Sequence, residues 1–119
     1  MAKVVRTHPH PILTEHDTFA DLLTSVDIYA DVGVWESIFA LTKHFHFIAT
    51  TNDLLVQILG SLDGGATYPI VVESEFAVDP GTPVSKTITV YYSHLKVQVK
   101  PTVAATHGTL ATQFAGASF

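Results

Sequence analysis

A glycine-rich stretch near the middle of the chain, residues 60–65 (GSLDGG), has the composition of a loop that binds phosphate, binds a metal ion or turns the chain. A phosphate-binding P-loop needs a lysine after its last glycine and then a helix, but Ala66 follows here and residues 68–72 have a strand pattern. A calcium loop needs several spaced carboxylates, and Asp63 has no acidic neighbour in this loop. Asp-Gly-Gly instead supplies the positive φ angles of a tight turn, so the sequence predicts a hairpin.

Two histidines have the spacing of metal ligands on a strand. His44 and His46 lie two residues apart in a strand-like run, which places both side chains on one face. A third ligand would have to come from elsewhere, such as His94 or Glu36. Without a third ligand nearby, an exposed or interface position is the simpler interpretation. We therefore predict no metal site and no other cofactor.

The acidic and nucleophilic residues do not form a recognisable catalytic pattern. Alternation along a strand places Glu73 and Glu75 on one face, as in a solvated edge or an interface patch, whereas the carboxylates of a glycosidase flank a sugar from opposite sides. No Gly-x-Ser-x-Gly nucleophile elbow occurs. The chain has no cysteine, which excludes thiol nucleophiles, thiolate metal sites and disulfides. The sequence predicts no catalytic residue and no enzymatic activity.

Composition limits the partners of the chain. Its 119 residues correspond to one domain, with 47% hydrophobic and only 14% charged residues, where about a quarter charged is usual. The deficit favours a surface partly covered by neighbouring molecules, or else a bland Thr/Ser surface. The formal net charge is −5 and Lys and Arg form no run, which argues against nucleic acid. No apolar run approaches the ~20 residues that cross a bilayer, and the N-terminus lacks the apolar region of a signal peptide. We expect no nucleic-acid or membrane partner and synthesis in a cytoplasm.

The first 20 residues differ from the rest of the chain. Pro9 and Pro11 bracket His10, and each proline disfavours helix at the residue before it. We predict an extended N-terminal arm over residues 1–20, either a disordered leader or a strap over a neighbour, followed by a domain of residues 21–119. A short helix over residues 17–26 is the alternative for the end of this arm.

The remaining sequence alternates apolar and polar residues with the period of half-buried strands. Turn clusters separate the runs at intervals that suit an all-β sandwich or barrel. We predict an all-β fold, a two-sheet antiparallel β-sandwich of about eight strands with jelly-roll or Greek-key connections. The expected strands are residues 26–30, 34–41, 44–51, 54–60, 68–78, 86–92, 94–100 and 109–116.

Several of these runs match a known pattern. The stretches LLVQILGSLDGGATYPIVV and VSKTITVYYSHLKVQVKPTVAATHGTLATQFAG resemble small β-sandwich structural proteins of tailed bacteriophage virions. Three elements carry the resemblance: Gly-Ser-Leu-Asp-Gly at 60–64, Tyr-Ser-His-Leu-Lys-Val-Gln-Val-Lys at 92–100, and Gly-Thr-Leu at 108–110. The resemblance covers roughly residues 34–116 and leaves the N-terminal arm unaccounted for.

The resemblance implies a non-enzymatic virion protein, typically a capsid decoration or cement protein that forms a homotrimer. Such a protein would bind the major capsid protein or other virion proteins at the capsid surface after assembly in the host cytoplasm. The expected contact residues lie in the arm and at the tip of the central turn: Thr7, His8, Pro9, His10, Pro11, Glu15, His16, Asp63, Gly64 and Gly65.

Two other functions stay open from the sequence. One is an accessory tail or baseplate module of similar fold. The other is a carbohydrate-binding adhesion module, in which exposed aromatic side chains would stack on sugar rings. The candidate aromatic residues are Trp35, Tyr68, Tyr91 and Tyr92.

Overall fold

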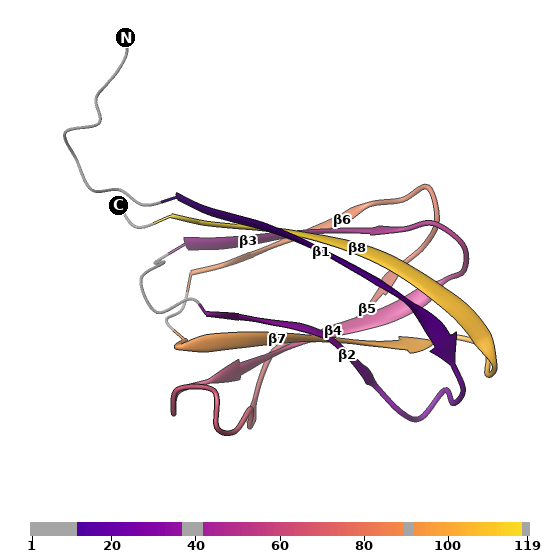
Figure 1. Cartoon of the computed structure of the whole chain (residues 1–119), viewed down its shortest axis with the longest axis horizontal. Helices are drawn as coiled ribbons and strands as arrows, with labels where there is room; N and C mark the ends of the chain where they lie inside the picture. Colours follow the sequence, from indigo (N-terminus) through magenta and orange to yellow (C-terminus); the bar gives the residue numbers. More distant parts are fainter. Residues whose placement is uncertain (1–11, 37–41, 90–91, 118–119) are drawn as a thin grey trace, which may run out of the picture.

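The computed structural model describes residues 12–36, 42–89 and 92–117, apart from the side chains of residues 12–17 and 117. Eight strands form two four-stranded antiparallel sheets, which Figure 1 shows as two stacked layers. The strands are β1 (Ile12–Leu23), β2 (Ala30–Glu36), β3 (Thr42–Ala49), β4 (Leu54–Ser61), β5 (Ile70–Val78), β6 (Val84–Ile88), β7 (His94–Pro101) and β8 (Thr106–Ala117). The prediction of an all-β, two-sheet antiparallel sandwich of eight strands is confirmed.

The order of the strands is that of a jelly roll. Sheet A has the order β1-β8-β3-β6 and sheet B the order β2-β7-β4-β5. Among these eight strands only β4 and β5 follow each other within one sheet, and every other connection passes between the sheets (Figure 1). This arrangement agrees with two interlocked Greek keys. None of the described residues is helical, so these residues include no helix that could span a membrane.

Alternating side chains build the core between the two sheets. Every second residue of β4 and β7 is buried, as the period of a strand requires. Trp35 lies edge-on to Phe45 with ring centroids 5.4 Å apart, and Phe114 lies 5.0 Å from Phe45. Aromatic pairs at such distances add to the stabilisation that area burial provides. Trp35 is only 3% exposed, so it belongs to the core and offers no platform for a sugar ring.

The N-terminal part of the described chain differs from the expected arm. Residues 12–20 belong to β1, which pairs with β8 along its whole length, from Ile12 opposite Ala117 to Leu23 opposite Thr106. Phe19 and Leu23 pack against the core, and Gly108 on β8 leaves room for Leu23, whose Cδ1 would lie 2.7 Å from an added Cβ. The alternative helix over residues 17–26 is wrong, because pairing with β8 overrides the weak local preference.

Two further strands differ in position from the expectation. Of the predicted strands 26–30 and 34–41, only Ala30 and residues 34–36 belong to a described strand, β2, which includes a bulge between Asp31 and Gly33. Residues 26–29 are not part of a strand, and residues 37–41 lie outside the described residues. β5 has irregular pairing with β4 between Val56 and Leu59. These bulges break the expected alternation, so that Glu73 and Glu75 do not share one face. Glu73 reaches Lys86 at the edge of sheet A, at 3.4 Å, whereas Glu75 reaches Lys100 on sheet B, at 2.8 Å.

Candidate interaction surfaces

The loop between β4 and β5 is a hydrogen-bonded turn built on two side chains. Ser61 Oγ donates to Asp63 Oδ1 at 2.6 Å and accepts the amide of Gly65 at 3.0 Å. Asp63 Oδ1 also accepts the amide of Thr67 at 3.0 Å. Gly64 and Gly65 have φ of 75° and 89°, in the left-handed region that favours glycine. The predicted hairpin with positive-φ glycines is therefore confirmed.

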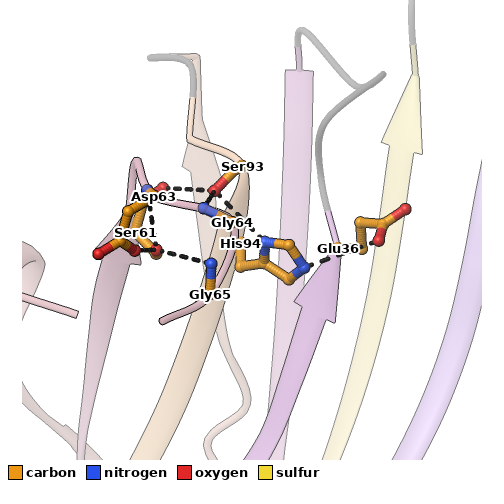
Figure 2. Close-up of polar contacts among 7 residues, drawn as sticks. All are labelled: Glu36, Ser61, Asp63, Gly64, Gly65, Ser93 and His94. Atoms are coloured by element: carbon orange, nitrogen blue, oxygen red, sulfur yellow. Dashed lines mark hydrogen bonds and ion pairs between the residues drawn. The ribbon is translucent and has the colours of Figure 1, made fainter. Parts of the chain in front are cut away.

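A second segment holds this loop in place. Ser93 donates its amide to the carbonyl of Ser61 at 2.9 Å and its hydroxyl to the same oxygen at 3.0 Å. Gly64 donates its amide to Ser93 Oγ at 3.2 Å. Figure 2 shows Ser93 between the turn and His94, whose Nε2 lies 3.6 Å from Glu36 Oε2. Two of the sequence elements that carry the virion resemblance, residues 60–64 and 92–100, are thus in direct contact.

The carboxylate of Asp63 is used inside the loop. Hydrogen bonds from Ser61 and Thr67 hold the pKa of Asp63 well below its ordinary value, so the group is a stable anion at neutral pH. These bonds orient both carboxylate oxygens toward the turn itself. The turn presents outward Leu62, 62% exposed, together with Asp63 and Gly64, which are both exposed. A partner contact at residues 63–65 would therefore meet the backbone of the turn and a carboxylate that is already hydrogen-bonded within it.

The outer face of sheet B carries a continuous polar network. Gln57 donates to Gln98 at 2.7 Å, and Gln98 donates to Asp31 at 2.7 Å, which links β4, β7 and β2 in one row. Lys96 lies 3.6 Å from Asp31 and 4.5 Å from the ring centroid of Tyr68. The charges on this face are thus paired with each other or stacked on an aromatic ring.

A second lysine–tyrosine pair, Lys100 and Tyr29, lies on the same outer face of sheet B. Lys100 Nζ is 4.8 Å from the ring centroid of Tyr29, and both Lys100 and the Tyr29 hydroxyl contact Glu75. Burial and the hydrogen bond to Glu75 raise the pKa of Tyr29 above its ordinary value. Hydrogen bonds from Lys100 and Tyr29 lower the pKa of Glu75. Both tyrosines on this face, Tyr29 and Tyr68, thus have a lysine ammonium over the ring.

The outer face of sheet A is different in chemistry. His44 Nδ1 lies 2.8 Å from Thr87 Oγ1, and His46 Nδ1 lies 2.8 Å from Ser85 Oγ, so hydroxyl groups of β6 fix both rings. His94 and Glu36, the sequence-based candidates for a third metal ligand, lie on sheet B. Within the described chain no three His, Asp or Glu residues come close enough to share an ion.

The candidate contact residues do not come together in one described site. Glu15 and His16 lie on β1, whereas Asp63, Gly64 and Gly65 form the turn after β4. Residues outside the described ranges include the remaining candidates Thr7, His8, Pro9, His10 and Pro11, and also Tyr91. Over the part of the chain that the structure describes, no pocket is found.

Sequence reasoning missed the tyrosine–lysine network on sheet B. The alternation of β7, with Lys96, Gln98 and Lys100 outward, was visible in the sequence. Their partners Tyr68 and Tyr29 lie outside the strands, just before β5 and β2. Their rings meet Lys96 and Lys100 of β7 because β2, β7 and β5 belong to one sheet. Only the order of the strands could have revealed these pairs.

Comparison with known proteins identifies the fold. No family model matches the sequence, and no curated protein matches it. A solved structure of Bacillus endospore appendages, described as a novel family of disulfide-linked pili, has a TM-score of 0.54 at 15% identity and covers 100% of this chain and 99% of that chain. The VP2 subviral particle of infectious bursal disease virus has a TM-score of 0.62 at 12% identity, over 92% of this chain and 33% of that chain. The Gx strain of that virus has a TM-score of 0.57 at 13% identity, over 93% and 33%.

These similarities concern the fold alone, because the identities are low. The chain spans about a third of the VP2 chains that it resembles. It spans almost the entire length of the appendage protein. The chain therefore matches nearly the whole of one solved chain and one part of a longer one.

Proposed function

We propose that this protein is a non-enzymatic structural subunit that assembles with copies of itself and with other proteins of a virion or a surface appendage. The observation that carries the proposal is the two-way match of 100% and 99% to the appendage protein, a subunit of a polymer, at a TM-score of 0.54. The likeness to the viral protein VP2 supports the same class of role. The described surfaces agree with it, since they are sheet faces and turns without a pocket.

Within this class, a decoration or cement protein on the capsid of a tailed bacteriophage is the specific role that we propose first. The sequence elements at 60–64, 92–100 and 108–110 support it by their resemblance to small virion proteins. Residues 7–11, Glu15 and His16 on β1, and the turn 63–65 would contact the major capsid protein, and a homotrimer would bridge neighbouring capsomers. Such a clamp needs modest affinity at each contact, because later contacts are effectively intramolecular.

A subunit of a filament is the second candidate. The full-length coverage of the appendage protein favours it. The pili of that protein are disulfide-linked according to their description, but this chain has no cysteine. A filament of this protein would therefore be joined by noncovalent contacts between sheet surfaces and strand edges.

Electron microscopy with gold-labelled antibody against this chain tests the proposal in the organism or virus that encodes it. Label over the heads of phage particles would support the decoration role, and label confined to tails would support an accessory tail module. Label along cell-surface filaments would support the second candidate. Label that follows none of these assemblies, with the purified chain monomeric at all concentrations, would contradict a structural role.

A further inference from the structure

The two outer faces of the sandwich differ in charge. The outer face of sheet B carries Asp31, Glu36, Glu75, Lys96 and Lys100. On the outer face of sheet A, by contrast, none of the described side chains belongs to Asp, Glu, Lys or Arg. We call this surface the uncharged face, and its described residues are Thr18, Ala20, Leu22, Thr42, His44, His46, Ile48, Ser85, Thr87, His107, Thr109, Ala111, Gln113 and Ala115.

The absence of charge on this face is unusual for a molecule with a formal net charge of −5. The strand register places the two described lysines of sheet A on its inner side: Lys43 lies opposite Ile88, and Lys86 lies opposite Phe45. Small side chains, Ala and Thr, occupy most of β8 and the described part of β1 on this face. A broad surface of small uncharged side chains can be removed from water without burying an unpaired charge.

We propose that the uncharged face is the contact surface for a second copy of this chain, packed face to face; this inference rests on the self-assembly in the proposed function. A like face is the partner that fits best, because it adds no charge to the contact, whereas the outer face of sheet B would bring five charged side chains into it. A contact of one face with its own copy is isologous, and both copies contribute the same residues.

The size of the face is sufficient for a stable contact. The four strands of sheet A together cover roughly 600 Å² at about 3.3 Å per residue and about 4.8 Å per strand. Two such faces bury roughly 1,200 Å², at the lower end of specific protein interfaces. Stacked sheets approach to about 10 Å, and the small residues of β8 at the centre of the sheet allow this approach.

Light scattering after size exclusion on the full-length chain tests the inference. At pH 8 the expected mass is an even multiple of 12.9 kDa, which for the homotrimer of the first candidate means two trimers packed face to face. Gln113→Lys introduces a charge at an exposed position on the central strand β8, and we expect it to weaken association at least tenfold. The matched control is Val71→Lys, at a side chain 57% exposed on β5 of sheet B. This control makes the same change in net charge and should associate as the wild type does.

The outcomes separate this inference from the proposed function. A trimer at pH 8, or association that Val71→Lys disrupts and Gln113→Lys does not, would overturn the face-to-face contact and leave the structural role intact. A wild type that stays monomeric at every concentration and pH would overturn the inference and the self-assembly on which it rests.

Discussion

Gly60 is the residue whose replacement the structure resists most directly. A Cβ at this position would lie 2.6 Å from the ring of Tyr92 and 2.9 Å from Val72 Cγ2, and both neighbours are held in the core or beside it. We expect Gly60→Ala to destabilise the protein by about 1–3 kcal/mol through overpacking, as measured by urea unfolding. Gly64→Ala is the control, because nothing lies within 4 Å of Gly64 and only its positive φ opposes the change. Equal stability of Gly60→Ala and the wild type would contradict the close contact with Tyr92.

Asp63 makes the stability of the protein dependent on pH in the acid range. Hydrogen bonds from Ser61 and Thr67 lower its pKa in the folded chain below the ordinary value of 3.8. The stabilisation is therefore present above the unfolded value and lost as pH falls through the folded one. Asp63→Asn should lower Tm at pH 6, and the difference from the wild type should shrink between pH 6 and pH 3. A constant difference in thermal melts across this range would contradict the role of the charged carboxylate.

At the scale of the strand, β1 is a part of the sandwich that sequence reasoning assigned to an arm. Deleting residues 2–18 would remove seven of its twelve pairs with β8 and leave an edge of β8 unpaired. We expect this deletion to lower Tm strongly and to promote aggregation. Deleting residues 2–11 leaves every described pair of β1 in place and should keep Tm near the wild-type value, as followed by circular dichroism. Equal melting of the two truncated chains would show that β1 contributes little.

The particular strands show why part of this fold was predictable. In β7 the apolar residues alternate without interruption, so period two alone located this strand and its buried face. The same period located β3 and β4, but β4 is apolar on both faces and its sequence did not show which face is buried. In β1 the inner positions include Asp21 beside Phe19 and Leu23, and the pattern becomes visible only when β8 is known to be its neighbour. The bulges of β5 likewise depend on its pairing with β4. Lysine is seldom fully buried, yet Lys43 of β3 is. No local feature of the sequence predicts this burial.

At the scale of the whole molecule, the separation of charge between the two sheets predicts how association responds to salt. Salt weakens contacts between charged surfaces, because it screens charges over a Debye length of about 10 Å at 0.1 M. A contact between two uncharged faces involves no attraction between charges that salt could weaken. The net charge of −5 on each copy opposes association, and salt screens this repulsion. We therefore expect self-association of the wild type to stay constant or to strengthen between low and high salt in sedimentation velocity experiments at pH 8. Association that falls steeply with salt would instead place the contact on the charged outer face of sheet B, where Lys96 and Lys100 would exchange their present partners Asp31 and Glu75 for those of another copy.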